Sequence, residues 1–257
     1  MYSSMYSSTH DIWIQLIFGY PGTRSVPVPA RFRLIMLYRF VSGTLLDSEA
    51  LSTESLQGSV GKFGKVITWE LKQKILGLPK DAWSPIVISE LELEGLLSPE
   101  DLRDQWEQNF RDMSPRLLKC DGAEALTRRL KDMGIPQSIA TSSSKEALPI
   151  KRRNHEELFE RMEHVVTPDD PKVVNGKPAP DIYLAAANRM GLEPKHCLAF
   201  EDALSGVNSA KSAGMFVVAV PDSRLDKKPF WDAGADLVLS SLSEWDPAEW
   251  KLEVAGS

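Results

Sequence analysis

Cys197-Leu198-Ala199-Phe200-Glu201-Asp202 is an apolar run that ends in two adjacent carboxylates. Such a run is typical of a buried strand, and the segment after it, 204–213, has a helical pattern that Gly214 ends. A strand, an acidic turn and a helix in this order form half of a parallel α/β unit. Ligands of such sheets lie at the carboxyl ends of the strands, so Glu201 and Asp202 are the first candidates for a functional site.

The same alternation extends over the second half of the chain. Short β-rich apolar runs predict strands at 135–141, 163–166, 196–200, 216–220 and 237–239. Helical patterns lie between them at 122–133, 146–160, 180–190 and 204–213. This order predicts an α/β fold with a Rossmann-like, doubly wound parallel sheet as its core.

Residues 50–118 differ from the rest because they carry three helical segments and no strand signal. Thr68 is placed to cap a segment that runs to Gly77, and a second helical pattern spans 81–93. The third begins at Ser98-Pro99-Glu100-Asp101, where a capping serine precedes proline and two acids in the first turn. The pattern therefore predicts a helical insert in the α/β core.

The composition is that of an ordinary soluble protein of 257 residues, with 42% apolar residues and a mean hydropathy of −0.23. The net charge of −6 argues against nonspecific nucleic-acid binding, which needs clustered Lys and Arg. Two distant cysteines, Cys120 and Cys197, are too few for structural zinc and indicate reduced, buried thiols in an intracellular protein.

The first 40 residues are basic, with four Arg against one Asp, which leaves −9 for residues 41–257. Their apolar runs are too short to cross a bilayer, so no membrane association is expected. An acid-poor segment with Arg and Ser is typical of organelle transit peptides. We expect a cytoplasmic protein, with organelle targeting as the alternative.

Three stretches of the sequence, with five residues among them, are candidates for binding an anion or a cation. Adjacent carboxylates at a strand end are costly without a cation between them, so Glu201 and Asp202 suit Mg²⁺ unless they are a solvated loop pair. Lys177, in Gly176-Lys177-Pro178-Ala179-Pro180-Asp181, could neutralise phosphate charge or simply be solvated. Thr141 and Ser142 follow a predicted strand, where hydroxyl and N–H groups bind phosphate oxygens, although such runs are common in loops.

These stretches together resemble the motifs of the haloacid dehalogenase (HAD) superfamily of phosphatases. The first motif is matched by Gly43-Thr44-Leu45-Leu46-Asp47-Ser48-Glu49, the second by Thr141, the third by Lys177, and the fourth by Glu201-Asp202 with Gly206-Val207. The resemblance implies a helical cap inserted after the first strand, phosphate binding by Thr141, Ser142 and Lys177, and Mg²⁺ at Glu201 and Asp202. Phosphate monoester hydrolysis is the reaction that it implies, with Lys177 and Thr141 as catalytic residues.

A longer pattern is similar to one eukaryotic subgroup that includes pseudouridine-5′-phosphatases and glycerol-3-phosphatases. It consists of Lys151 and His155 before Leu158-Phe159, then Asp169-Asp170-Pro171, and finally Val220-Pro221-Asp222-Ser223-Arg224-Leu225. Without the resemblance, Lys151 and His155 are four residues apart on a predicted helix and would form a solvated face.

The first motif departs from the family at its two Asp positions, which here are Phe40 and Ser42. In the family the first Asp attacks phosphorus and the second acts as acid and base. Phe40 has no nucleophilic atom, Ser42 is a poor acid or base, and Asp47 is too far along the chain to replace either. We therefore expect an inactive chain with weakened Mg²⁺ affinity.

Two explanations of this departure remain open. The composition changes abruptly at residue 40, and the motif is nearly perfect from Gly43 onward, which favours replacement of an upstream exon by a gene-model error or by alternative splicing. The alternative is a pseudophosphatase that binds or senses a phosphorylated ligand. Family members place a central strand before this motif, and 34–40 is the only apolar run available for it, with Arg39 as a misfit.

The predicted organisation has three parts. Residues 1–32 form an atypical N-terminal extension, 33–49 and 119–257 form the HAD-like core, and 50–118 form the helical cap. The expected partner is a small phosphorylated metabolite such as a sugar, polyol or nucleoside phosphate, and the expected state is a monomer.

Overall fold

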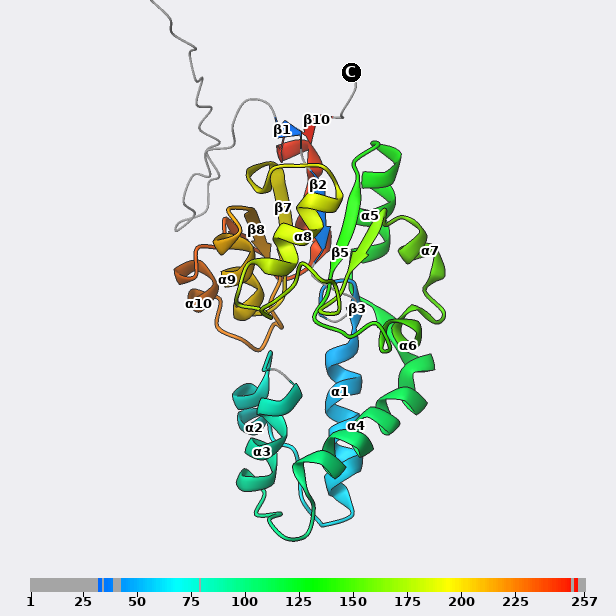
Figure 1. The fold of residues 1–257 in the computed structure, drawn as a ribbon, viewed down its shortest axis with the longest axis vertical. Helices are drawn as coiled ribbons and strands as arrows, with labels where there is room; N and C mark the ends of the chain where they lie inside the picture. The colour runs from blue at the N-terminus through cyan, green and yellow to red at the C-terminus, as the bar shows by residue number, and fades with distance from the viewer. Residues whose placement is uncertain (1–31, 34, 39–42, 79, 251, 254–257) are drawn as a thin grey trace, which may run out of the picture.

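The computed structural model describes residues 32–33, 35–38, 43–78, 80–250 and 252–253 (Figure 1). A six-stranded parallel sheet lies at the centre, in the order β6-β5-β2-β7-β8-β9. Its strands are β2 (Ile35–Tyr38), β5 (Gln137–Ala140), β6 (His164–Val166), β7 (Cys197–Glu201), β8 (Phe216–Ala219) and β9 (Leu237–Val238). The predicted doubly wound α/β core is confirmed.

The central strand is the short apolar segment β2, which pairs with β5 on one side and β7 on the other. The sequence placed a strand at 34–40, and its middle residues form β2. Leu34, Arg39 and Phe40 lie outside the described residues. The prediction that Arg39 is a misfit in this strand therefore stays a prediction.

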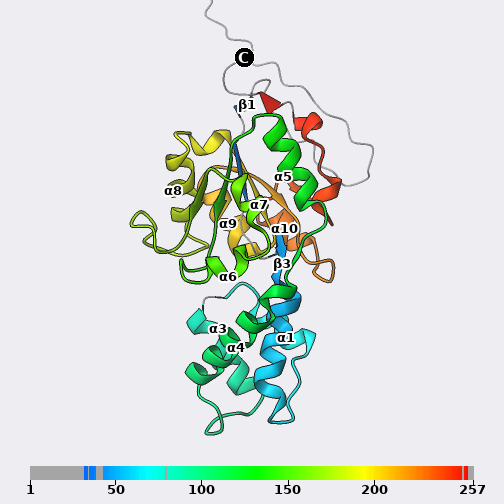
Figure 2. The same ribbon diagram turned by 90° about the vertical axis from the view of Figure 1, so that its right-hand side faces the viewer.

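Helices cover both faces of the sheet (Figures 1 and 2). They are α5 (Ala123–Asp132), α6 (Leu148–Arg152), α7 (Glu156–Glu160), α8 (Asp181–Arg189), α9 (Leu204–Ser212) and α10 (Lys228–Asp232). Alternate residues of β7 join different cores: Leu198 and Phe200 pack with α5 and α7, whereas Cys197 and Ala199 pack with α8, α9 and α10. This is the alternation of a strand buried on both faces.

A separate helical group extends from the carboxyl ends of the strands (Figure 1). It consists of α1 (Ser48–Gly61), α2 (Trp69–Ile75), α3 (Lys80–Glu90) and α4 (Pro99–Met113) around a core of its own. A two-stranded antiparallel link, β3 (Leu46–Asp47) with β4 (Leu118–Lys119), joins it to the sheet. We call α1–α4 the cap.

The remaining elements are short. They are β1 (Phe32–Arg33), which pairs with β10 (Leu252–Glu253), and the 3₁₀ turns η1 (Ser114–Arg116), η2 (Pro194–His196), η3 (Leu242–Glu244) and η4 (Pro247–Trp250). No helix in the described part of the chain is both long and apolar enough to span a membrane.

The predicted N-capping residues of α2 and α4 are confirmed. The hydroxyl of Thr68 accepts a hydrogen bond from the N–H of Leu71 at 3.3 Å, and that of Ser98 accepts one from Asp101 at 3.0 Å. Each bond satisfies one of the N–H groups that a helix start leaves unpaired, worth about 1 kcal/mol.

Helix α1 was not predicted from the sequence, because small polar residues lie on its buried face where apolar ones were expected. Ser55 and Ser59 are buried, and their hydroxyls bond back to the carbonyls of Leu51 and Ser55. These bonds satisfy the hydroxyl donors inside the cap, so the helix buries serine without leaving it unpaired.

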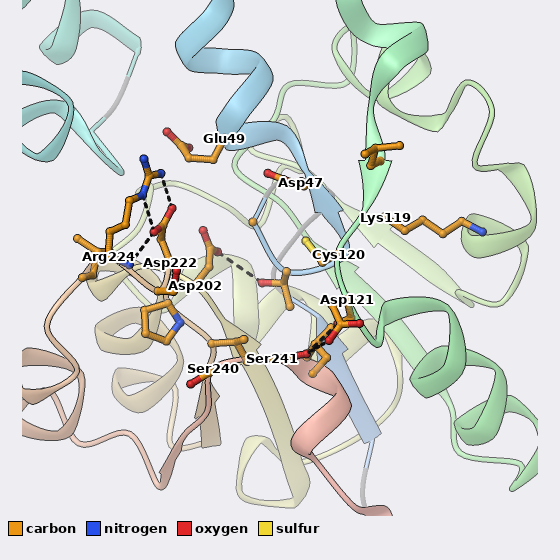
Figure 3. Close-up of a pocket in the computed structure, with 18 of the residues that line it drawn as sticks. Asp47, Glu49, Lys119, Cys120, Asp121, Asp202, Asp222, Arg224, Ser240 and Ser241 are labelled. Atoms are coloured by element: carbon orange, nitrogen blue, oxygen red, sulfur yellow. Dashed lines mark hydrogen bonds and ion pairs between the residues drawn. The ribbon is translucent and has the colours of Figure 1, made fainter. Parts of the chain in front are cut away.

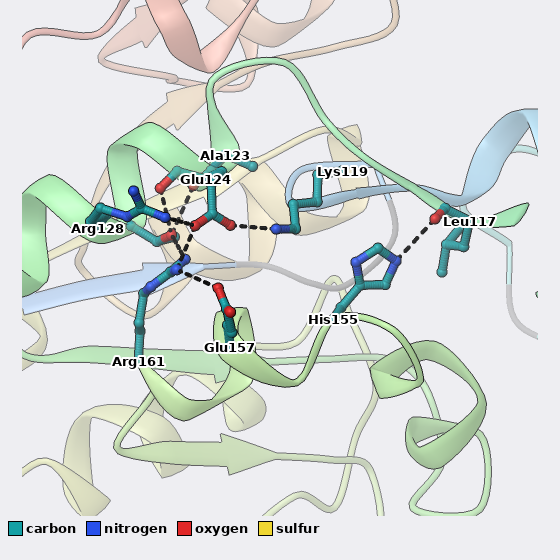
Figure 4. A network of polar contacts seen from close by, with 9 residues as sticks. Leu117, Lys119, Ala123, Glu124, Arg128, His155, Glu157 and Arg161 are labelled. Carbon is teal, nitrogen blue, oxygen red and sulfur yellow. Dashed lines mark hydrogen bonds and ion pairs between the residues drawn. The ribbon is translucent and has the colours of Figure 1, made fainter. Parts of the chain in front are cut away.

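The prediction that Lys151 and His155 share one solvated helix face is wrong. The predicted helix 146–160 is two short helices, α6 and α7, separated by Asn154 in the left-handed region at φ 67°. His155 is buried, and its Nε2 lies 3.0 Å from the carbonyl oxygen of Leu117 (Figure 4). Burial lowers the pKa of His155, which keeps the ring neutral at this contact.

The thiol predictions hold for Cys197, which is buried, and only in part for Cys120, which is half-buried. Burial raises the pKa of each thiol to about 12. Neither is therefore a thiolate near neutral pH.

Gly122, at the start of α5, lies against the backbone of η3, and a substitution there would test this packing. Gly122 has φ 78°, and a Cβ there would lie 2.3 Å from the backbone nitrogen of Ser243. Gly64, at φ 71°, has no atom within 4 Å of that position. We predict that Gly64→Ala costs about 1–2 kcal/mol from backbone strain. Gly122→Ala should cost about 3 kcal/mol or more, because η3 must also move.

The measurement is the free energy of unfolding from urea titrations of both variants and the unmodified chain. Equal losses in the two variants would contradict the close packing of η3 on α5.

Candidate functional site

The predicted acidic pair lies where β7 ends. Glu201 is the last residue of β7 and is fully buried, and Asp202 follows it half-buried. Consecutive side chains of a strand point to opposite faces. Glu201 accordingly faces α8 and α9, and Asp202 faces the turn at Gly43 and Thr44. The two carboxylates therefore have different partners.

Glu201 is the centre of a buried polar cluster. Lys177 Nζ lies 2.9 Å from its Oε1, and the Tyr183 hydroxyl donates to the same oxygen. Only 3% of the Lys177 side chain is exposed. The ammonium also donates to the carbonyl oxygen of Ala140 at 3.3 Å and lies 4.5 Å from the ring centre of Tyr183. A charge that is removed from water is costly unless it is paired, so separating Lys177 from Glu201 in the interior would be strongly unfavourable.

A glycine packs against each of the two carboxylates. A Cβ at Gly206 would lie 1.8 Å from Glu201 Oε2, so the first turn of α9 contacts that carboxylate. A Cβ at Gly43 would lie 2.1 Å from Asp202 Oδ2, and Gly43 has φ 88°. Both positions require glycine for a close approach, and Gly43 also requires it for its backbone conformation.

Thr141 directly follows Ala140, the last residue of β5, whose carbonyl oxygen Lys177 contacts. It is fully buried, and its hydroxyl oxygen accepts a hydrogen bond from Ser143 N–H at 2.9 Å. A threonine hydroxyl also donates, and none of the described residues accepts its hydrogen. Ser142 is exposed at the turn. Thr141 is therefore held as a hydrogen donor at the strand end.

The fold thus brings together Lys177, Glu201 and the end of β5 that carries Thr141. Asp202 lies on the other side of the β7 terminus. Phe40 and Ser42, where the family has its two Asp residues, lie outside the described residues. The roles predicted for these residues in phosphate binding and catalysis stay predictions.

Sequence reasoning missed Tyr183 and the contact role of Gly206. Tyr183 lies on α8 between the buried residues Ile182 and Ala185. An aromatic residue with a polar tip on a buried helix face needs a hydrogen-bond partner, and that was the available signal. The glycine contact depends on distances that no sequence pattern reports.

The described residues do not fit a complete Mg²⁺ site. Glu201 Oε1 already bonds to Lys177 and Tyr183, and Asp202 Oδ1 lies 3.5 Å from the Thr44 hydroxyl. In the described part of the chain no three His, Cys, Asp or Glu side chains gather as metal ligands. Hard cations take several oxygen ligands, so these two carboxylates alone are a weak site.

A cavity of about 480 Å³ opens beside Asp202, between the cap and the sheet (Figure 3). Gly43, Thr44, Asp202, β3, β4 and the loop Pro221–Leu225 contribute to its wall. Asp47, which ends β3, points into it. We call this cavity the cleft; its size suits a small metabolite.

The buried pair can be tested by stability. We predict that Lys177→Met destabilises the fold by about 3–5 kcal/mol, because the Glu201 carboxylate loses its cation in the interior. The double variant Lys177→Met, Glu201→Gln should be more stable than Lys177→Met alone, since the neutral amide still accepts from Tyr183.

Urea titration of the two variants gives both free energies of unfolding. Lys228→Met, which removes the exposed partner of Asp232, is the control and should change little. A double variant less stable than Lys177→Met would show that the charge on Glu201 is held by other groups.

Comparison with known proteins places this geometry in a family. A family model for haloacid dehalogenase-like hydrolases matches residues 41–214 and so begins directly after Phe40. A mitochondrial (DL)-glycerol-3-phosphatase 1 of Arabidopsis thaliana is 41% identical over 215 residues, covering 82% of this chain and 72% of the relative. A probable pseudouridine-5′-phosphatase of Drosophila melanogaster is 38% identical, covering 82% and 91%.

Solved structures agree. A putative beta-phosphoglucomutase from Thermotoga maritima has a TM-score of 0.68 and 28% identity, covering 82% of this chain and 95% of its own. A HAD family hydrolase from Deinococcus radiodurans, solved with bound phosphate and sodium, has a TM-score of 0.68 and 25% identity, covering 84% and 93%. The chain belongs to the haloacid dehalogenase-like hydrolases, and its relatives include phosphatases of small phosphorylated substrates.

Proposed function

We propose that this chain is by descent a phosphatase of small phosphomonoesters, such as sugar, polyol or nucleoside phosphates, and that it is inactive as given because Phe40 and Ser42 replace the two Asp residues. The observation that carries the proposal is the buried Lys177, held by Glu201 and Tyr183 beside the end of β5. A lysine fixed at a strand end supplies positive charge for a phosphoryl group. Thr141 supplies a hydroxyl donor next to it.

The missing steps are those that need a carboxylate. A phosphatase of this family attacks phosphorus with a carboxylate oxygen, and a second carboxyl group protonates the departing alkoxide and later activates water. The ring of Phe40 carries no lone pair for the attack. The hydroxyl of Ser42 ionises too weakly to serve as acid or base. The same two changes remove oxygen ligands, which supports our proposal that Mg²⁺ binds weakly.

The proposal predicts that the chain as given has no Mg²⁺-dependent phosphatase activity and that Phe40→Asp with Ser42→Asp restores it. Loss of a covalent nucleophile costs several orders of magnitude in rate. The assay is hydrolysis of an aryl phosphate, followed by small phosphomonoesters. In the double variant Mg²⁺ should raise the melting temperature, whereas in the unmodified chain it should not.

Two results contradict this prediction. One is turnover by the unmodified chain that Lys177→Ala abolishes. The other is a folded double variant that neither hydrolyses phosphate esters nor is stabilised by Mg²⁺, which would refute the roles given to Thr141, Glu201 and Asp202.

A second function, ligand binding without turnover, is favoured by the satisfied cluster around Lys177. Within the described residues, Glu201 balances the charge of Lys177, and Tyr183 donates a hydrogen bond to Glu201. A binding protein of this kind should be stabilised by phosphate and by phosphomonoesters. We predict a concentration-dependent rise in melting temperature with inorganic phosphate that Lys177→Met removes.

If an upstream exon was replaced by a gene-model error or by splicing, we expect the opposite: a marginally stable protein whose melting temperature phosphate does not raise. The family match begins at Val41, where the composition of the chain changes, and this supports exon replacement. Sequencing the 5′ end of the transcript decides between the two independently of any assay.

A further inference from the structure

The wall of the cleft carries more acidic than basic side chains, whereas a site for an anionic phosphate is expected to be basic. Among the described residues that line it, five are acidic and two are basic. The acids are Asp47, Glu49, Asp121, Asp202 and Asp222, and the bases are Lys119 and Arg224. What the wall offers to a ligand therefore depends on how these two cations are held.

Arg224 is committed to its neighbour Asp222. Its Nε lies 2.9 Å from Asp222 Oδ1 and its Nη2 2.7 Å from Oδ2, a two-point contact (Figure 3). Its guanidinium also lies 4.0 Å from the ring centre of Trp69 on α2. Planar pairing and stacking fix an arginine more firmly than a single contact does. Arg224 therefore joins the core to the cap, and the pair that it forms with Asp222 adds no net charge to the cleft.

Lys119 points away from the cleft, although its backbone lines it (Figure 3). Its ammonium lies 2.5 Å from Glu124 Oε2, and the other oxygen of Glu124 bonds to Arg128 and Arg161 (Figure 4). Hydrogen bonds from Arg161 and Lys119 lower the pKa of Glu124 to about 2. Because Glu124 stays ionised outside the cleft, it holds the ammonium of Lys119 outside the cleft as well.

The acids are less fully compensated. Glu49 is paired with Lys72 at 2.6 Å. Asp121 accepts hydrogen bonds from Ser241 and Ser243, which lower its pKa and keep it ionised without adding positive charge. Asp47, Asp121 and Asp202 all contribute to raising the pKa of the Cys120 thiol, after burial, to about 12. The thiol thus responds to a negative field inside the cleft.

We propose that this cleft selects phosphomonoesters by charge: it admits those whose alcohol part is uncharged and rejects those that carry a second anionic group. The inference rests on the proposed function, which places the phosphate at Lys177 and Thr141, outside the lining of the cleft, and the alcohol part in the cleft beside Asp202. A second carboxylate or phosphate in the cleft would meet Asp47 and Asp121, while both lining cations are held by Asp222 and Glu124. Asp47 and Asp121 are exposed, so solvent screens each repulsion, and the selection comes from two like charges that act together on the second anion.

The test compares two esters that differ by one charge. sn-Glycerol 3-phosphate and 3-phosphoglycerate have the same carbon chain, and the second carries a carboxylate in place of a hydroxymethyl group. The protein is the full chain with Phe40→Asp and Ser42→Asp, at fixed ionic strength, and the readout is the ratio of kcat/KM for the two esters. We expect a ratio of about 10 in favour of glycerol 3-phosphate, since each exposed carboxylate contributes about threefold.

Variants of the wall then assign the cause. Asp121→Asn keeps an oxygen acceptor for the two serines and removes one charge, and should lower the ratio by about threefold. Glu94→Gln makes the same change of net charge at an exposed position of the cap and should leave the ratio unchanged. Lys119→Met should also leave it unchanged, because that ammonium faces Glu124.

The outcomes separate this inference from the proposed function. Equal kcat/KM for the two esters, or preference for 3-phosphoglycerate, overturns the charge selection and leaves the phosphatase ancestry standing. A rise of the ratio in Lys119→Met overturns it too, since Lys119 would then be binding the second anion. If the restored variant hydrolyses neither ester and neither ester raises the melting temperature of the unmodified chain, the proposed function and this inference are both wrong.

Discussion

The ion pair between Lys177 and Glu201 is the constraint on which the rest of the site depends. Both side chains are almost fully buried, and each charge would be prohibitively costly without the other. The pair ties the loop before α8 to the end of β7, and its contact with the Ala140 carbonyl adds the end of β5. Tyr183 and Gly206 complete the enclosure from α8 and α9. One buried contact thus sets the spacing of three loops at the carboxyl edge of the sheet.

The cap builds the opposite wall on the same edge. The chain enters the cap through β3 and returns through β4, which pair with each other. Helices α1 and α4, at the start and end of the cap, therefore both adjoin this link, and α2 lies near the loop after β8. There Trp69 stacks on Arg224, and a Cβ at Gly77 would lie 3.5 Å from the Ser205 hydroxyl. Elsewhere along the boundary the contacts are apolar, because Leu51 of α1 and Phe110 of α4 pack into a core of the sheet. The rest of the cap has a core of its own, so the cleft lies where cap and sheet meet through polar groups.

Much of the fold followed from the sequence, because parallel strands buried on both faces produce apolar runs that need no context. β7 and α9, with the glycine that ends it, are read directly from 196–214. Features that depend on tertiary partners were not readable: α1 buries serines that bond to their own helix, and the helix predicted at 146–160 breaks at Asn154. In the site, Lys177 and Glu201 were named, but Tyr183 and the outward turn of Lys119 depend on neighbours distant in sequence.

The loss of two acids at residues 40 and 42 has different consequences for chemistry and for stability. In the function that we propose, the reaction needs a nucleophile at residue 40 and an acid and base at residue 42. Lys177 has a buried counter-charge in Glu201, and Glu201 also accepts a hydrogen bond from Tyr183. Removing the two Asp residues therefore leaves no uncompensated lysine in the interior. A chain of this family can in this way lose its reaction while the buried pair, and the loops that it spaces, persist.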